Sequence, residues 1–299
     1  MKKIIKGVIS FTVLCMIFYS IDFELLKTTN FYFSPSNLLL FLVLLISSLF
    51  IRSYRWSILM NDTKVIVSQK ESFKLLLVGS SLNIFLPSGA GDIVKSYYGF
   101  KWTGIKERML AVSLLDKLIA VGSVLFITPF AFYYSNNYLI LIAGILSILP
   151  FIFLFYFNFF NRYILFNIPF KFIVKKIKKI DLELLIGHIK TPTLKIFISF
   201  IISIIAWIVT YVNLYLCFKV VGLSIPFTAV ICSIPFLTLG RLFPFTLNGI
   251  GTDEALIIFL FSSYTKLNEQ ILIAALLYRI ILIIFPAIAG LPILLFKKK

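Results

Sequence analysis

The chain has 299 residues, of which 60% are hydrophobic and 14% are charged, and its formal net charge is +17. Soluble globular proteins carry about 45–50% apolar and about 25% charged residues, so this composition excludes an ordinary soluble domain. The apolar residues form runs of about 20, the length that a membrane-spanning helix needs. Such runs exclude the alternating strands of a membrane barrel. The sequence therefore predicts an all-α, polytopic helical membrane protein, with residues 1–299 in a single integral membrane domain.

The positive charge indicates cytoplasmic loops and attraction to anionic lipid rather than nucleic acid binding. The predicted partners are therefore membrane lipids with anionic headgroups, and no nucleic acid. The three cysteines lie in apolar segments without metal-like spacing, and the chain has one histidine. We therefore expect no metal site and no cofactor.

The N-terminal half begins with a basic segment, Met1 to Lys6, which places the N-terminus inside. The helix predicted over about Ile4–Ile21 has no small-residue cleavage site after it, so we expect a retained helix rather than a signal peptide. A second helix, about Asn37–Leu59, returns to the cytoplasm, where Arg52 and Arg55 mark its end.

The next apolar segment, Leu75 to Leu86, has about 12 residues and basic flanks, including Lys95. It is too short to span a bilayer, so we expect it to enter from the cytoplasm and turn back at residues 87–91. An amphipathic surface helix is the alternative. Spanning helices then follow over about Leu110–Phe132 and Tyr138–Phe157. Residues 158–195 carry eight Lys or Arg residues and form a basic cytoplasmic loop.

The C-terminal half contains a helix over about Ile196–Phe218 and an apolar segment, Pro226 to Leu247, that is broken by proline and glycine. We expect this broken segment to enter the membrane from the outside and to turn back. The last helix, about Ile271–Phe296, ends at three lysines inside. The prediction is six spans and two re-entrant segments, with both termini cytoplasmic, in the cytoplasmic membrane of a prokaryote.

A pattern that occurs twice connects the two halves. A shift of 162 residues places Asp92 on Glu254 and Lys117 on Arg279. The loop charges give the two copies, residues 37–132 and 196–296, opposite orientations. An inverted repeat with interrupted helices is typical of transporters that bind their substrate near the midplane of the membrane.

Ionisable groups inside apolar spans cost at least about 2.5–3.5 kcal/mol each, so they should be paired or line a cavity. We expect cations at Lys117, Arg241 and Arg279 to attract an anionic group such as a lipid phosphate. The acids should balance the empty site or bind a cationic headgroup. The substrate-binding candidates are Asn83, Asp92, Asp116, Lys117, Arg241, Asp253, Glu254 and Arg279. In the alternative, Asp92–Lys117 and Glu254–Arg279 are internal salt bridges.

One turn rich in glycine and proline precedes the acid in each half. The structural residues of these two turns are Pro87, Gly89, Gly91, Pro244, Gly249 and Gly251. Backbone N–H groups there, and the positive end of a helix starting at each acid, would point toward an anionic ligand. Asn83 and Asn248 are better explained as caps for freed backbone groups. The tryptophans Trp56, Trp102 and Trp207 are more typical of the interfacial belt than of a binding site.

Enzyme motifs are absent from the sequence, which contains no Walker loop, no Rossmann fingerprint and no GxSxG element. The longest polar stretch, residues 158–195, is too short for a catalytic domain. We therefore expect no enzymatic activity.

Two stretches, SLNIFLPSGAGDIVKSYYGFKWTG followed by LAVSLLDKL, and LFPFTLNGIGTDEALIIF, resemble the transmembrane region of the lysylphosphatidylglycerol synthase family, also called flippase-like. The similarity covers nearly the whole chain, including Arg52 to Trp56. The motif residues that it implies are Asn83, Pro87, Gly91, Asp92, Asp116, Lys117, Pro244, Gly249, Gly251 and Glu254. The chain departs from the family at Asn248, where glycine is usual, and at Asp253, where a basic residue is frequent.

The resemblance implies translocation of lipids between leaflets, in some members of aminoacylated phosphatidylglycerol. We therefore expect a flippase for a lipid or lipid-linked saccharide, with an anionic or aminoacylated headgroup that passes through a polar midplane site. A secondary transporter of a small soluble anion and a non-transporting scaffold subunit remain alternatives. Two further partners are left open: a second copy of the chain in a homo-oligomer, or an enzyme of lipid or glycan synthesis.

Overall fold

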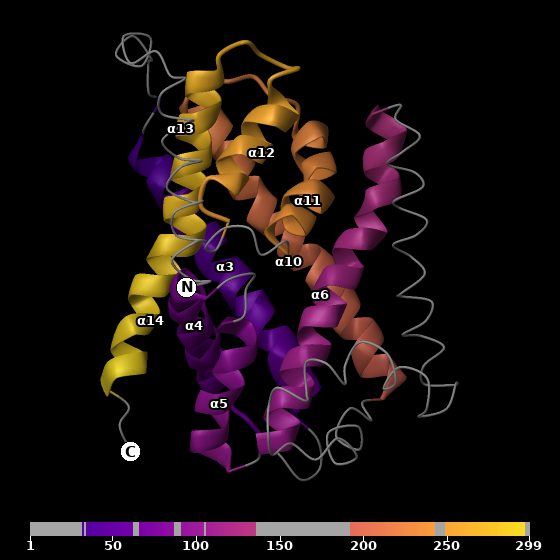
Figure 1. Ribbon diagram of the computed structural model, residues 1–299, viewed down its shortest axis with the longest axis vertical. Coiled ribbons are helices and arrows are strands. Elements are labelled where there is room, and N and C mark those ends of the chain that lie inside the picture. Colours follow the sequence, from indigo (N-terminus) through magenta and orange to yellow (C-terminus); the bar gives the residue numbers. More distant parts are fainter. Residues whose placement is uncertain are drawn as a thin grey trace, which may run out of the picture.

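The computed structural model describes residues 32, 34–61, 66–86, 91–104, 106–135, 192–242 and 249–296. The described elements are helices: α3 (Pro35–Met60), α4 (Gln69–Phe85), α5 (Gly91–Thr103), α6 (Lys106–Ser135), α10 (Thr193–Val220), α11 (Phe227–Leu242), α12 (Thr252–Phe261), α13 (Asn268–Arg279), the π-helix η2 (Ile280–Ile284) and α14 (Phe285–Phe296) (Figure 1). The predicted helices at Ile4–Ile21 and Tyr138–Phe157, most of the basic loop, and Pro87, Gly89, Pro244 and Asn248 lie outside the described residues.

Four helical segments are long and apolar enough to cross a membrane: Pro35–Met60, Arg108–Ile127, Thr193–Val220 and Asn268–Leu295. They coincide with four of the six predicted spans, so the all-α, polytopic membrane class is confirmed. The number of spans stays a prediction, because the other two fall outside the described part of the chain.

Helix α4 begins earlier than the sequence predicted, at Gln69 rather than Leu75. The side chain of Ser68 accepts a hydrogen bond from the backbone of Glu71, and the Glu71 carboxylate accepts one from the backbone of Ser68. This capping box satisfies two N–H groups that a helix start leaves unpaired. The polar first turn therefore belongs to the helix, which has 17 residues.

The two interrupted segments lie at opposite ends of the molecule. Figure 1 shows α4 and α5 in its lower half, and α11 and α12 in its upper half. In each segment the two helices pack against each other, so the chain folds back after the turn. The segment after each turn is itself helical, as expected for helices that start near Asp92 and Glu254.

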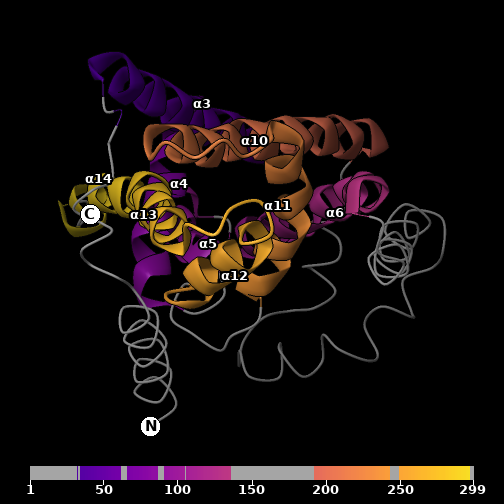
Figure 2. The ribbon, with the colours of Figure 1, turned by 90° about the horizontal axis from the view of Figure 1, so that it is seen from above.

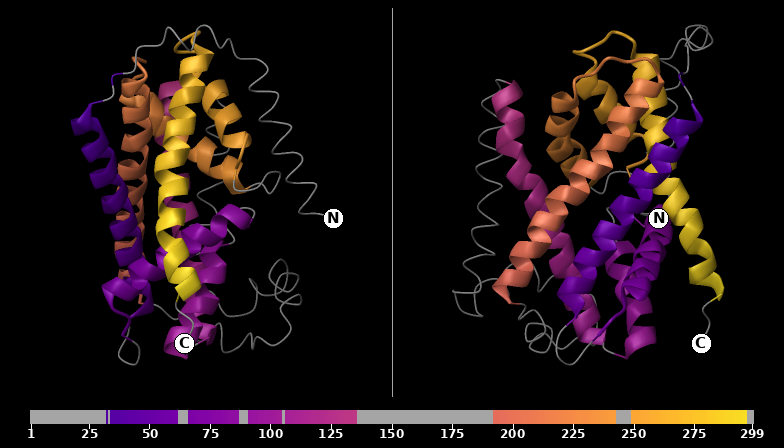
Figure 3. Two further views of the ribbon diagram at one scale, coloured as in Figure 1. Left: turned by 90° about the vertical axis from the view of Figure 1, so that its left-hand side faces the viewer. Right: turned by 180° about the vertical axis from the view of Figure 1, so that it is seen from behind.

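The packing of the helices has the same pattern in both halves. Helix α3 contacts α4 and α6, and its counterpart α10 contacts α11 and α13. Helix α5 contacts α6 as α12 contacts α13, and the crossed contacts α4–α14 and α11–α6 also correspond. Helices α3 and α10 lie side by side on one face of the molecule (Figures 2 and 3).

The apolar core has two parts. The larger surrounds buried residues such as Tyr211, Phe218 and Phe261, and it joins α10, α11, α12 and α13 to residues of α3, α4 and α6. The smaller joins the end of α3 to α6 around Trp56 and Met109. Between these two cores, polar and charged side chains gather in the interior.

Candidate functional site

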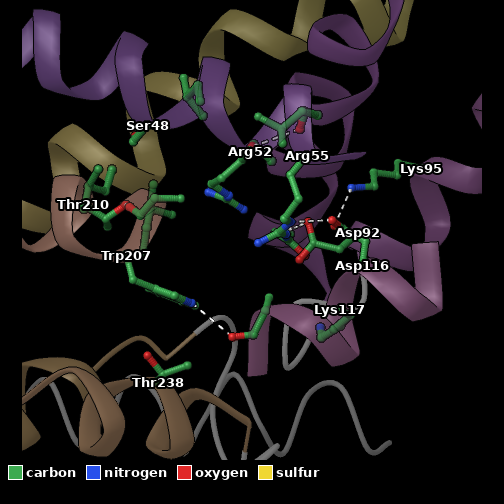
Figure 4. A pocket seen from close by; sticks show the side chains of 18 of the residues that line it. Ser48, Arg52, Arg55, Asp92, Lys95, Asp116, Lys117, Trp207, Thr210 and Thr238 are labelled. Atoms are coloured by element: carbon green, nitrogen blue, oxygen red, sulfur yellow. Dashed lines mark hydrogen bonds and ion pairs between the residues drawn. The ribbon is translucent and has the colours of Figure 1, made fainter. Parts of the chain in front are cut away.

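A cavity of about 220 Å³ lies between α3, α4, α5, α6, α10, α11 and η2 (Figure 4). Its charged lining comprises four cations and two carboxylates: Arg52, Arg55, Lys95, Lys117, Asp92 and Asp116. The rest of the lining is mainly small, hydroxylated or aliphatic. The cavity therefore combines an excess of basic side chains with an apolar wall. Of the elements around it, α3, α6, α10 and the segment that contains η2 are long and apolar enough to cross a membrane.

A buried ion-pair cluster forms one wall of the cavity. The Nε atom of Arg55 donates a hydrogen bond of 2.7 Å to Oδ1 of Asp116. The Nζ atom of Lys95 lies 4.0 Å from Oδ2 of the same carboxylate. Arg55, Lys95 and Asp116 are 5%, 3% and 7% exposed, respectively. The Asp116 carboxylate is thus shared by two buried basic side chains, and Asp92 lies on the same cavity.

A chain of hydroxyl groups fixes the Arg55 guanidinium. Its Nη1 atom donates to Oγ of Ser203 at 2.7 Å, and Oγ of Ser203 lies 2.7 Å from Oγ of Ser123. Ser123 donates its single proton to the carbonyl of Ala120 at 2.8 Å. Ser203 must therefore donate to Ser123 and accept from Arg55. This directed chain links α3, α10 and α6 and holds the guanidinium in one orientation.

The start of α5 is held against α4. The Oδ1 atom of Asn83 accepts a 2.8 Å hydrogen bond from the backbone N–H of Gly91, and its Nδ2 atom lies 3.4 Å from Oδ1 of Asp92. A Cβ on Gly91 would lie 2.5 Å from the carbonyl oxygen of Gly79, so only glycine fits this close approach. Asn83 thus caps the turn, as the sequence predicted, and it also lines the cavity.

The second acid–base cluster lies around Arg279, and the cavity lining does not include it. The Nη2 atom of Arg279 donates to the carbonyl of Gly249 at 2.8 Å and to Oε2 of Glu254 at 2.9 Å. Its Nε atom donates to Oε1 of Glu254, and Oδ2 of Asp253 lies 3.4 Å from Nη2. Glu254 also accepts a 2.8 Å bond from the backbone of Gly251.

This cluster braces the turn before α12. Gly249 and Gly251 have positive φ angles of 74° and 82°, and the buried carboxylates of Asp253 and Glu254 are 3% and 1% exposed. The salt bridge Glu254–Arg279 is therefore formed, and Arg279 uses its donors on the protein itself. The structure does not bring Arg279, Asp253 and Glu254 to the cavity that Lys117 lines, and a shared site for these residues stays a prediction. Arg241 is one of the last residues of α11, and its side chain lies outside the described residues.

The sequence profile of the family described as "Lysylphosphatidylglycerol synthase TM region" matches residues 3–290. The chain belongs to this family. A comparison with curated proteins gave no match. The family agrees with the resemblance stated from the two motifs, and it assigns the chain to a class of membrane proteins involved in lipid handling.

In this member of the lysylphosphatidylglycerol synthase TM region family, the sequence did not identify three of the cavity cations as site residues. The sequence predicts Arg52, Arg55 and Lys95 as basic flanks that orient the helices, and it places the two arginines in the stretch that resembles the family, but it assigns none of them to a site. All three line the cavity. Arg52 and Arg55 are three residues apart on a helix, so they share a face that an apolar span would bury. That spacing was the available signal.

The tryptophan interpretation also needs correction. Trp56 is 2% exposed and donates a 3.3 Å hydrogen bond to Ser113, so it is a core residue rather than part of an interfacial belt. Trp207 lines the cavity, and its Nε1 atom donates to the carbonyl of Ala120 at 3.1 Å. Trp207 is therefore part of the candidate site.

Proposed function

We propose that the chain moves a lipid with an anionic headgroup between the two leaflets of its membrane. The headgroup phosphate binds in the cavity of Figure 4, where the basic side chains of the lining form hydrogen bonds and ion pairs with it. The observation that carries this proposal is the excess of basic side chains over carboxylates in a cavity that helices long and apolar enough to cross a membrane help to enclose.

Arg55 supplies the geometry for phosphate. A guanidinium has five N–H donors, and its planar fork matches two oxygens of a phosphate. The bonds to Asp116 and Ser203 use two of these donors. Among the described residues, nothing else takes the remaining three. Arg52, one helical turn earlier, has no hydrogen-bond or ion-pair partner in the described part of the chain, so it adds a second cation that is ready to bind.

The two carboxylates extend the range of headgroups. Asp92 and Asp116 lie on the same cavity as the cations, so a headgroup with both a phosphate and an ammonium would find partners for each. This supports anionic or aminoacylated headgroups. The reaction is transport alone, and we propose no bond-making chemistry for this chain.

The repeated packing of the helices supports a mechanism of alternating exposure. In that mechanism, inverted halves rock around a fixed site so that it faces one leaflet and then the other. The matching contacts of α3, α4, α5 and α6 with those of α10 to α14 fit two such halves. The energy would come from the gradient of the lipid or of an ion.

A small soluble anion is the second candidate, because the same cations would bind it. The aliphatic part of the lining, which includes Leu45, Leu49, Leu282 and Ile283, favours a lipid. A scaffold role alone would not explain why four cations and two carboxylates line one cavity, since charges inside a membrane protein cost several kcal/mol each.

The test uses purified protein in liposomes that carry fluorescent phospholipids in both leaflets. Dithionite quenches only the outer leaflet, so extra quenching over empty liposomes measures flipping. We expect Arg52→Gln to reduce flipping of anionic lipid by about tenfold, the effect of losing one charged hydrogen bond. The matched control is Lys70→Gln, because Lys70 is exposed at the start of α4 and outside the cavity.

Equal flipping by the wild type and Arg52→Gln would contradict the role of the cavity. No flipping by the wild type of anionic, zwitterionic or sugar-linked lipids would contradict lipid transport. Uptake of a radiolabelled soluble phosphate ester by the same liposomes would then favour the soluble-anion transporter.

A further inference from the structure

We propose that the acyl chains of the bound lipid leave the cavity sideways, between α3 and the π-helix η2. This inference rests on the proposed function and adds the route that the lipid takes. A headgroup in the interior must stay connected to chains in the bilayer, so a lipid transporter needs a lateral opening as well as a site. We call the seam formed by Leu45, Leu49, Leu282 and Ile283 the α3–η2 seam.

The α3–η2 seam is aliphatic and thin. Leu45 and Leu49 are each 5% exposed and line the cavity from α3, and Leu282 and Ile283 line it from η2. Directly beside them in the chain, Ile46 is 57% exposed on α3, and Ile284 is 38% exposed on η2. Helices α3 and η2 contact each other. A single layer of apolar side chains therefore separates the charged cavity from the lipid-facing surface.

The neighbouring seams are closed by hydrogen bonds or by close backbone contact. Between α4 and α14, Ser81 donates a 2.6 Å bond to the carbonyl of Ala287, and a Cβ on Gly290 would lie 2.2 Å from the carbonyl oxygen of Leu77. Between α6 and α10, Ser123 and Ser203 lie 2.7 Å apart. No hydrogen bond joins α3 to η2 among the described residues. The α3–η2 seam is thus the one of these three that can part without breaking a polar contact.

The π-helix itself adapts the seam to this role. A π-turn has one residue more than an α-turn. Such turns are rare in proteins, and those that occur are often found at functional sites. It spans Ile280–Ile284, directly after Arg279, which the second ion-pair cluster fixes to Glu254. The helix is therefore anchored on one side of η2, and its hydrogen-bonding pattern changes from α to π at η2. This combination lets the cavity-facing residues of η2 move while the turn before α12 stays in place.

The experiment places larger side chains in the α3–η2 seam. It measures passage of the acyl chains and binding of the headgroup separately. Leu49→Trp and Ile283→Trp add volume on the two sides of the seam, and Ile284→Trp adds the same volume on the exposed face of η2. Flipping of long-chain anionic phospholipid is measured by dithionite quenching. Binding of glycerol phosphate, which has no acyl chains, is measured by calorimetry on the purified proteins.

We expect Leu49→Trp and Ile283→Trp to lose flipping by about tenfold or more, because overpacking a seam costs enough to close it. They should keep their affinity for glycerol phosphate, and Ile284→Trp should behave as the wild type in both assays. Normal flipping by both seam variants would overturn the route. Loss of glycerol phosphate binding together with flipping would also overturn it, since the seam would then belong to the headgroup site. Absence of flipping in the wild type would refute the proposed function itself.

Discussion

Removal of Arg279 tests whether the second ion-pair cluster supports the fold or takes part in transport. Its guanidinium donates to the carboxylate of Glu254 and the carbonyl of Gly249, and it lies 3.4 Å from a carboxylate oxygen of Asp253. The side chains of Arg279 and Glu254 are 12% and 1% exposed. Arg279→Ala would therefore leave two buried carboxylates without a cation and one turn carbonyl without a donor.

The expected loss is large. Breaking a buried ion pair by removing one partner costs about 3–5 kcal/mol, because the remaining charge stays buried. In a chain of this size, each kcal/mol lowers the melting temperature by about 2–4 °C, so we expect a drop of roughly 6–20 °C. The backbone bond from Gly251 to Glu254 survives the substitution and keeps the loss within this range.

The assay is thermal unfolding of the purified protein in detergent, with size-exclusion chromatography or tryptophan fluorescence as the readout. The matched control is Arg52→Ala, which removes a half-buried arginine that has no hydrogen-bond or ion-pair partner in the described part of the chain. We expect this control to unfold near the wild-type temperature. The reasoning is refuted if Arg279→Ala unfolds within about 2 °C of the wild type. If such a variant also lost flipping, the result would support a substrate-binding role for Arg279.

Two further pairs of substitutions test the local geometry. Ser203→Ala removes the acceptor of a buried Arg55 N–H, so it should cost about 1–3 kcal/mol in denaturant unfolding. Ser199→Ala, whose buried Oγ has no partner in the described structure, should cost nothing, and equal losses would contradict the hydroxyl chain. Gly104→Ala adds a side chain in open space at φ 75°, a strain of about 1–2 kcal/mol. Gly249→Ala adds similar strain plus a contact 2.7 Å from the Asp253 carboxylate, so it should unfold at a clearly lower temperature.

The spanning helices were predictable because their signal is local. An apolar run of about 20 residues has few other stable conformations in a membrane protein. The run predicted over Ile196–Phe218 became α10, Thr193–Val220. The start of α4 was missed because it depends on the reciprocal bonds of Ser68 and Glu71, a polar capping signal that a search for apolar runs ignores.

The candidate site was predictable only in part, and the limit lies in the chemistry of arginine and lysine. Asp116 stood out because an acid in an apolar span needs a partner, and the salt bridge Glu254–Arg279, which the sequence offered as an alternative to a binding role, is formed. The partner of Asp116 is Arg55, 61 residues earlier in the chain. Arginine near the end of a span fits the positive-inside rule equally well. Local sequence therefore does not distinguish a cation that orients the helix from one that enters a site.

The repeat also shows why only one of its halves forms the charged cavity. The shift that places Lys117 on Arg279 places Asp116 on Tyr278, Arg55 on Cys217 and Lys95 on Ile257. These three counterparts are uncharged and at most 1% exposed, so they build apolar core.

The two halves thus share a helical arrangement but carry different chemistry. The first half holds the charged residues of the cavity, and the second holds an ion-pair cluster next to a π-helix. Under the proposed function, one charged site must serve both leaflets, because the second half has no equivalent of the Arg55–Asp116 pair. The motion must therefore change which side of this one site is covered. The anchored turn before α12 and the change from α to π at η2 beside it place that motion at the α3–η2 seam.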